Sequence, residues 1–399
     1  MPRFEPFNGL RYNAEAGYVD DVIAPPYDVI GPDERARLEA RSPYNAVRIE
    51  LPRDDDATGR SRYGVAADLL RQWQGDKILV ADDPPAFYVH RMGFHDAAGR
   101  PRQTVGVIGA LGIEAPGQGD VLPHEHTTPK DRADRLEMLR QVRANTSPIW
   151  GLSLARGLSE LCQLPGPPVA RATDDDGVHH RLYLVTETGL CDAIATVVGS
   201  APIVVADGHH RYDVADMYRQ EPGAAPGADA IMALIVELTE EQLTVRATHR
   251  LLSGLPEGFD VVAALDVWFE VVEAGPLSGA ATLPVRMDDA GALGLVTEAG
   301  AWLLRPRPPT EAAAQADLDS SRVAVATAAF PDGLVVRYQH GVDEVTAALA
   351  SGSAQAAVLL RPATVAQIAA SGHERTRMPP KTTFFWPKPR TGLVFRLLD

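Results

Sequence analysis

The chain has 399 residues, of which 45% are hydrophobic and 23% are charged, and this composition is typical of a globular protein rather than a disordered one. Its formal net charge of −15 argues against a protein that coats DNA, because nucleic-acid affinity depends mostly on basic patches. The two cysteines, Cys162 and Cys191, form neither a disulfide framework nor a metal-binding pattern. We expect both to be core residues in a reducing cytoplasm.

The sequence contains no stretch of 18 uncharged apolar residues, so we expect no membrane span. Residues 1–9 contain no long apolar run and predict no signal peptide. The length predicts two or three regions, which we place at 1–102, 103–252 and 253–399. Strand and helix patterns are mixed along the chain, and they predict an α/β (mixed α+β) fold class.

In the first region, residues 21–30 are predicted to be extended and rich in turns, because prolines disfavour helix in the residues before them. Hydrophobic periodicity predicts the other elements of this region. They are a short helix over 33–40, a strand over 47–51, an amphipathic helix over 63–73, and strands over 86–92 and 104–113.

In the second region, Thr127 or Thr128 followed by Pro129 predicts the start of a helix that runs to Arg143. Strands are predicted over 181–186 and 202–206, and a pair of strands over 231–237 and 243–249. The third region is predicted to contain helices over 260–269, 343–349 and 364–371, and strands over 323–326 and 357–360.

The most informative motif follows the predicted strand over 202–206. An Asp207-Gly208 turn leads directly into a predicted helix whose first residues are His209, His210 and Arg211. The free N–H groups and the positive dipole end of a helix N-terminus attract phosphate, and an arginine adds a planar fork for its oxygens. We therefore predict a phosphate site here, with a polar surface turn as the alternative.

A second motif places Glu125 between His124 and His126, directly before the helix predicted from Pro129. A carboxylate in such a place can act as a general base toward a hydroxyl group. The two histidines could instead bind a metal ion. A loop that only caps the following helix is the third interpretation, and the spacing leaves all three open.

Two weaker motifs lie later in the chain. Lys381, Thr382 and Thr383 combine a cation with two hydroxyls, as phosphate loops do, but no glycine-rich P-loop signature occurs in the sequence. A surface turn explains these three residues as well. His249 and Arg250 close a predicted strand and could either line a pocket or form a surface pair.

Taken together, these motifs resemble the free serine kinases of the ParB/sulfiredoxin-like superfamily. The matching blocks are, in chain order, PHE at 123–125, VADGHHRY at 205–212 and PPKTT at 379–383. The chain also resembles, over nearly its whole length, a large bacterial family that long carried only an unknown-function label. That resemblance is carried by the motifs PPYDVI, SPYN, NTSPI, ADGHHRY and MPPKTT.

The resemblance implies a ParB/sulfiredoxin-like core with N-terminal and C-terminal additions. It also implies transfer of a phosphoryl group from ATP or ADP, with Mg²⁺, to the hydroxyl of free L-serine or a related hydroxy amino acid. Glu125 would accept the hydroxyl proton, and Asp207 would be the second catalytic residue, with Mg²⁺ near it. The phosphate ligands would be Asp207, Gly208, His209, His210, Arg211, Lys381, Thr382 and Thr383, and the substrate-binding residues His124, His126, His249 and Arg250.

Two other functions compete with this hypothesis. A ParB-like, nucleotide-dependent DNA-binding or partition protein would use a similar phosphate box, but the net charge and the lack of a visible basic helix-turn-helix argue against nucleic acid as a partner. A metal-dependent hydrolase would use His124, His126, His209 and His210. The sequence predicts small-molecule partners without a membrane, and it does not predict the oligomeric state.

Overall fold

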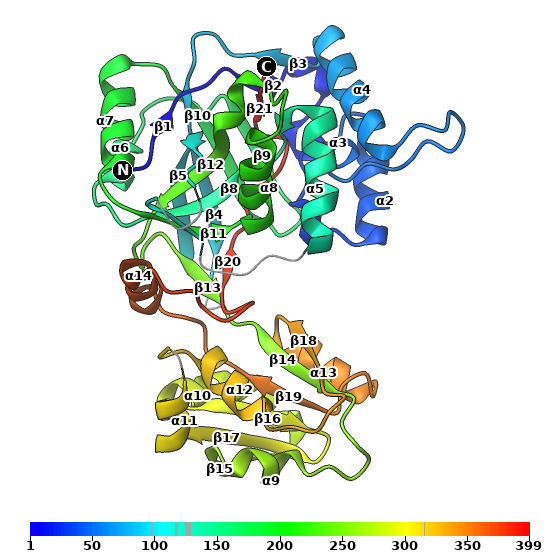
Figure 1. Cartoon of the computed structure of the whole chain (residues 1–399), viewed down its shortest axis with the longest axis vertical. Coiled ribbons are helices and arrows are strands. Elements are labelled where there is room, and N and C mark those ends of the chain that lie inside the picture. The colour runs from blue at the N-terminus through cyan, green and yellow to red at the C-terminus, as the bar shows by residue number, and fades with distance from the viewer. Residues whose placement is uncertain (97–98, 116–118, 124–128, 315) are drawn as a thin grey trace. The chain divides into compact units, whose positions relative to one another are not determined.

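The computed structural model describes residues 1–96, 99–115, 119–123, 129–314 and 316–399, and these form two compact units (Figure 1). Unit 1 comprises Met1–Leu243 together with Pro387–Asp399, and unit 2 comprises Thr244–Trp386. Unit 2 is therefore inserted into unit 1, to which the chain returns after Trp386. The regions expected from the sequence, with boundaries after residues 102 and 252, divide the chain at other points.

The described strands of unit 1 form a large sheet of nine strands and a smaller one of four. The spatial order in the large sheet is β6 (Val121–Pro123), β11 (Ile203–Asp207), β8 (Ile149–Ser153), β12 (Ala230–Glu237), β5 (Pro101–Gly112), β4 (Phe87–His95), β10 (His179–Val185) and β9 (Ala170–Thr173), with β1 (Phe4–Glu5) paired to β5. Most neighbours are antiparallel, but β6 with β11 and β8 with β12 are parallel. The small sheet has the order β3 (Leu79–Ala81), β2 (Gly9–Tyr12), β21 (Phe395–Leu397) and β7 (Ala144–Asn145).

The helices of unit 1 bury apolar faces against these sheets. They are α1 (Val19–Val22), α2 (Pro32–Arg41), α3 (Val47–Glu50), α4 (Arg62–Gly75), α5 (Pro129–Val142), α6 (Leu158–Leu161), α7 (Thr188–Gly199) and α8 (His209–Arg219), with 3₁₀ turns at Ala14–Ala16, Tyr27–Val29 and Pro226–Asp229. In α4, for example, Ala66, Leu70 and Trp73 are buried at helical spacing. Figure 1 shows α5 and α8 side by side, with Leu136 and Val214 in their shared core.

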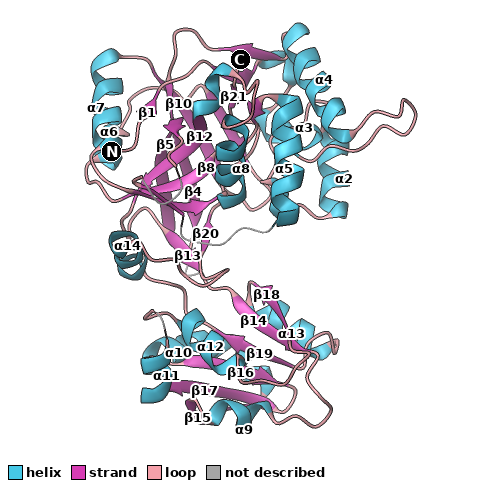
Figure 2. Ribbon diagram, viewed as in Figure 1, coloured by secondary structure: helices cyan, strands magenta, loops and turns pink. Residues whose placement is uncertain are grey.

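Unit 2 is built on one central sheet with helices around it (Figure 2). Its buried apolar residues form two cores. The order of its six described strands is β15 (Phe269–Gly275), β17 (Gly300–Pro306), β16 (Leu293–Thr297), β19 (Ala356–Leu359), β14 (His249–Ser253) and β18 (Val335–Gln339), and a separate pair joins β13 (Thr244–Arg246) to β20 (Phe384–Trp386). The helices are α9 (Val261–Asp266), α10 (Leu283–Ala290), α11 (Pro308–Ala313), α12 (Asp319–Thr327), α13 (Val342–Ala350) and α14 (Val365–Glu374), with a 3₁₀ turn at Leu277–Thr282. Residues of α10 and α13 fill one core, and residues of α9 and α12 fill the other.

The predicted mixed α/β class is confirmed, as are most of the predicted elements. The helices predicted over 33–40, 63–73, 260–269, 343–349 and 364–371 are α2, α4, α9, α13 and α14, and the helix predicted from Pro129 is α5. The strands predicted over 86–92, 104–113, 181–186, 202–206, 231–237 and 357–360 are β4, β5, β10, β11, β12 and β19. The segment predicted to be extended over 21–30 contains the end of α1 and a 3₁₀ turn.

Three predictions of elements were wrong. The strand predicted over 47–51 is the helical turn α3, because the Asn45 side chain accepts the N–H of Val47 at 2.9 Å and so starts a turn. The strand predicted over 323–326 lies in α12, since a short apolar run fits a buried helix face as well as a strand. The strands predicted to pair with each other do not: β12 pairs with β5 and β8, and β13 pairs with β20.

Both cysteines pack with the core of unit 1, Cys162 fully buried and Cys191 half-buried at its edge. Across the described ranges, no helix has the length and apolar character that spanning a membrane requires.

Candidate functional site

The predicted phosphate motif begins at an irregularity in strand β11. β11 pairs with β8 as far as Val205 opposite Gly151, and the next pair is Asp207 opposite Trp150, so one residue is bulged out directly before Asp207. A bulge bends its strand and changes the direction of the side chains next to it. The side chain of Asp207 is therefore set by a local break in the ladder at the end of the strand.

Gly208 joins β11 to α8 in a conformation that favours glycine. Its φ and ψ angles are 88° and 27°, in the left-handed region. A Cβ atom at this position would lie 2.8 Å from Cγ2 of Ile149, a distance that packing does not tolerate. The turn is thus tight enough to bring the start of α8 directly over the end of β11.

Asp207 contacts two cations. Nη2 of Arg211 donates to Oδ2 of Asp207 at 2.9 Å, and Nζ of Lys388 forms an ion pair with Oδ1. The three side chains are only 12–13% exposed. Burial alone would raise the pKa of Asp207, but the charges of Lys388 and Arg211 outweigh burial and hold this pKa well below its usual range. Asp207 is therefore ionised at neutral pH.

The guanidinium of Arg211 is fixed on its other side by the segment before β8. Nη1 donates to Oγ of Ser147 at 2.7 Å and to the carbonyl oxygen of Pro148 at 2.8 Å. Nε is buried and has no hydrogen-bond partner among the described residues. A buried donor without a partner is rare and costly. The other hydrogen bonds of Arg211, to Ser147, Pro148 and Asp207, must therefore outweigh this cost and hold the guanidinium in place.

A small cavity lies against the same arginine. Its volume is about 50 Å³, and its polar lining consists of Glu50, Arg135, Asn145, Thr146, Ser147 and Arg211. The guanidinium of Arg135 also stacks on the ring of Tyr27, 4.2 Å from the ring centre, and burial raises the pKa of that tyrosine. Unit 1 therefore places two arginines and two hydroxyls around one polar cavity.

The first phosphate motif is thus brought together as a single cluster within unit 1. His209 is buried and His210 is half-buried at the first turn of α8, next to Asp207, Gly208 and Arg211. The second motif, His124, Glu125 and His126, lies outside the described residues. The chain is described as far as Pro123 in β6, which pairs with Val205 of β11.

The later predicted residues belong to unit 2, where Arg250 contacts the backbone of Lys381. Arg250 donates from Nη2 to the carbonyl oxygens of Pro380 at 3.3 Å and Lys381 at 3.1 Å, and Nδ1 of His249 accepts the N–H of Leu360 at 3.2 Å. Arg250 therefore fixes the segment that carries the lysine. The ligand roles of His249, Arg250, Lys381, Thr382 and Thr383 stay predictions from the resemblance.

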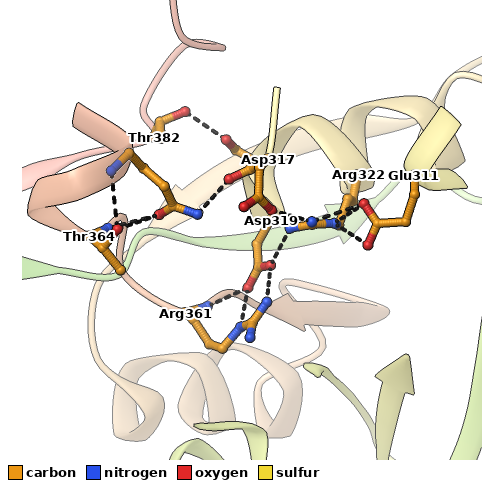
Figure 3. A network of polar contacts seen from close by, with 9 residues as sticks. Glu311, Asp317, Asp319, Arg322, Arg361, Thr364 and Thr382 are labelled. Atoms are coloured by element: carbon orange, nitrogen blue, oxygen red, sulfur yellow. Dashed lines mark hydrogen bonds and ion pairs between the residues drawn. The ribbon is translucent and has the colours of Figure 1, made fainter. Parts of the chain in front are cut away.

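Thr382 lines a larger cavity of about 350 Å³ in unit 2, beside a network of charged side chains (Figure 3). Its hydroxyl lies 2.7 Å from that of Ser320 and donates to the carbonyl oxygen of Pro379. In the network, Asp319 accepts hydrogen bonds from Arg361 at 2.6 and 2.9 Å and from Arg322 at 3.2 Å.

The described residues do not form a protein-bound magnesium site at Asp207. Both of its carboxylate oxygens already accept from Arg211 and Lys388. Nowhere in the described ranges do three or more histidine, cysteine, aspartate or glutamate side chains converge in a way that would hold a metal ion. A metal bound mainly by protein carboxylates is therefore not what this part of the chain is built for.

Sequence reasoning missed Lys388, Ser147 and Glu50. Lys388 lies between two prolines shortly after an aromatic run, and that composition was its one visible signal. It reaches Asp207 from 181 residues away, and Ser147 reaches Arg211 from 64 residues away. Contacts between residues so distant in the chain leave no pattern in a single sequence.

Several solved structures are similar to this chain at low identity. A conserved hypothetical protein from Pyrococcus furiosus matches at 14% identity with a TM-score of 0.38, over 69% of this chain and 90% of its own. A free serine kinase variant in complex with AMP also matches at 14% and 0.38, over 67% and 84%. SbnI from Staphylococcus aureus, truncated at its C-terminus, matches at 12% and 0.38, over 73% and 87%. TM-scores this low support no conclusion about function.

A search of curated proteins finds no match. A family model described as "Protein of unknown function (DUF1015)" matches residues 4–321, which is most of the chain. The chain therefore belongs to the DUF1015 family.

Proposed function

We propose that this protein transfers a phosphoryl group from ATP or ADP to the hydroxyl of free L-serine or a related hydroxy amino acid, giving O-phosphoserine or its analogue. The observation that carries the proposal is the cluster of Asp207, Arg211 and Lys388 at the start of α8. It combines two cations with the positive end of an 11-residue helix, which suits a phosphate group.

The charges of this cluster match what phosphoryl transfer requires. Most of the catalysis in this reaction comes from positioning and from neutralising charge on the phosphate oxygens. Arg211 and Lys388 would supply that positive charge. Asp207 would hold the two cations in place through its negative charge. Its lowered pKa makes it a poor acceptor of a proton at neutral pH, so it would not be the general base.

Glu125 is the proposed general base. It follows Pro123 by two residues in the sequence, and β6 ends beside the strand that leads to Asp207. In the proposed step, Glu125 accepts the hydroxyl proton while the hydroxyl oxygen forms a bond to the terminal phosphorus. The bond from that phosphorus to the bridging oxygen breaks, and ADP or AMP leaves.

Magnesium would enter this reaction with the nucleotide. In nucleotide sites Mg²⁺ is held mainly by phosphate oxygens and water, with few protein ligands. That mode of binding is compatible with an Asp207 whose oxygens are already taken by Arg211 and Lys388.

Phosphorus NMR of the full chain with Mg²⁺, L-serine and either ATP or ADP tests the proposal. We expect a new phosphomonoester signal to grow as the signal of the terminal nucleotide phosphate disappears, and the active nucleotide identifies the donor. Homoserine and threonine in place of serine define the acceptor. If both nucleotides bind and no hydroxy amino acid is phosphorylated, the kinase proposal is wrong.

Glu125→Gln tests the base. We expect turnover to fall by about 10²–10⁴-fold with little change in nucleotide affinity, because a general base acts on the chemical step. Glu137→Gln, which removes a half-buried carboxylate from α5, serves as the control and should turn over normally. Normal turnover by Glu125→Gln would remove Glu125 from the mechanism.

A further inference from the structure

Glu50, at the end of α3, is a carboxylate buried without an ion-pair partner. It is 1% exposed, and both of its oxygens accept hydroxyl groups, Oε2 from Thr146 at 2.5 Å and Oε1 from Ser147 at 2.9 Å. Among the residues that the structure describes, no cationic group lies within ion-pair distance of this carboxylate. Burying a charge in this way is expensive, so its position calls for an explanation.

The hydroxyl of Ser147 connects Glu50 to the phosphate cluster. A serine hydroxyl has one proton to donate and two lone pairs that accept. Since the carboxylate of Glu50 can only accept, the proton of Ser147 points to Glu50, and its lone pairs are left for Nη1 of Arg211 at 2.7 Å. Glu50 therefore decides which way the hydroxyl faces.

Arg211 needs such support because its own placement is unfavourable. Its Nε is buried without a partner, and the guanidinium is held by Ser147, Pro148 and Asp207. Burial lowers the pKa of Arg211, while the charges of Asp207, Asp28 and Glu50 raise it above its ordinary value. Glu50 thus acts on Arg211 both through the serine and through its charge.

We propose that Glu50 is a positioning residue that orients Arg211 for an anionic ligand through the hydroxyl of Ser147. Glu50 would touch neither the phosphate nor the acceptor. The role of Arg211 as a phosphate ligand rests on the proposed function, whereas the orientation of Arg211 by Glu50 does not. The test therefore measures the two separately.

Glu50→Gln is the test variant, because glutamine keeps the shape but its amide can also donate and so competes for the lone pairs of Ser147. We expect ADP affinity, measured by calorimetry, to fall about 10-fold, as expected for a weakened hydrogen bond to a charged group. Exchange of the Arg211 Nε–H with solvent, followed by arginine side-chain NMR, should rise about 10-fold. Arg211→Lys identifies the resonance by its loss.

Glu237→Gln is the matched control. Glu237 is also a buried carboxylate of unit 1, 7% exposed, and it accepts the N–H of Ser159. None of the hydrogen bonds described for Ser147 and Arg211 involves it. We expect neither ADP affinity nor the exchange of the Arg211 Nε–H to change in this variant. A general loosening of the core would affect both variants alike.

Ser147→Ala, alone and combined with Glu50→Gln, completes the test. If Glu50 acts through Ser147, the double variant should be no worse than the single ones, whereas independent effects would multiply. Multiplied effects, or unchanged exchange in Glu50→Gln, would overturn the proposal. If Glu50→Gln does not fold, Thr146→Val takes its place, because it removes a hydroxyl that holds Glu50 and leaves the contact of Ser147 with Arg211 in the protein: unchanged exchange of the Arg211 Nε–H then overturns the positioning role. A wild-type protein that binds no ADP would refute the proposed function alone, since the exchange measurement would still judge Glu50.

Discussion

Asp207 and Asp319 are two largely buried aspartates, one in each unit, that each contact two cationic side chains. Within the described ranges, Arg211 forms an ion pair with Asp207 alone. Arg322, in contrast, pairs with Asp319 and also with Glu311 at 2.9 Å and Asp317 at 2.5 Å (Figure 3). The two clusters share a motif but differ in the ratio of carboxylates to cations.

That ratio separates a candidate ligand site from a structural network. Around Asp319, three carboxylates contact two arginines, so the arginine charges are neutralised by the protein itself. Around Asp207, this carboxylate pairs directly with Arg211 and Lys388 at the start of a helix, while the charges of Asp28 and Glu50 act on Arg211 as well. An anion would gain more at Asp207, and the Asp319 cluster is better suited to joining α12 to the end of β19 through Arg361.

Replacing Arg211 or Arg361 by alanine should give the largest difference in activity between the two clusters, and it tests whether only the Asp207 cluster is a ligand site. We expect Arg211→Ala to lower kcat/KM for phosphoryl transfer by about 10³-fold, because an arginine on a transferring phosphoryl group contributes that much or more. Arg361→Ala is the matched variant in unit 2 and should retain ADP affinity within about twofold, a change of under 0.5 kcal/mol. The comparison fails if Arg361→Ala loses ADP binding and Arg211→Ala keeps it.

Asp319→Asn should give the largest effect on stability. The substitution leaves Arg361 without its carboxylate, and breaking a buried pair costs about 3 kcal/mol. Hydrogen exchange of unit 2 peptides, read by mass spectrometry, should show faster opening there and unchanged protection in unit 1. Glu311→Gln is the control, because Glu311 is 46% exposed and should matter much less.

Acid should destabilise both units, and unit 1 more. Burial lowers the pKa of His90 and His180 in unit 1, where Nε2 of His90 lies 3.0 Å from Nδ1 of His180, and burial lowers the pKa of His249 in unit 2 to about 4. Each group is neutral when folded but gains a proton in the unfolded chain below pH 6.5. Stability is therefore lost as pH falls below 6.5.

Each such histidine contributes a slope of up to about 1.4 kcal/mol per pH unit. Unfolding followed from pH 7.5 to 5.0 should show about twice the slope in peptides of unit 1 as in those of unit 2. His95→Gln, which removes an exposed histidine from β4, the strand of His90, is the control. Equal slopes in wild-type protein and in His90→Phe would show that the buried pair is not the cause.

The parts of the site that could be predicted from sequence are those that lie close together along the chain. Asp207, Gly208 and Arg211 lie within five consecutive positions, so a strand, a turn and a helix start could be recognised as one motif. Lys388 and Glu50 join them only through tertiary contacts, by way of Asp207 and Ser147. Residues that act through a folded surface leave no local pattern to find.

The fold shows the same division. Long segments such as α4 and β12 were predicted correctly because α4 repeats its buried residues at helical spacing and β12 is a continuous apolar run. The short segments 47–51 and 323–326, which lie at α3 and in α12, were assigned to strands, since three or four apolar residues fit both structures. The pairing of β13 with β20 could not be predicted, because their partners lie about 140 positions apart and nothing local selects them.

The insertion of unit 2 has a consequence for synthesis on the ribosome. Lys388 is the second residue after the chain re-enters unit 1, and β21 pairs with β2 through Leu10 opposite Phe395. A nascent chain can fold most of unit 1 early, yet it cannot place the lysine on Asp207 until all of unit 2 has been translated. The cluster around Asp207 would thus be complete only after the whole of unit 2 has left the ribosome, and fragments that end within unit 2 would lack its lysine.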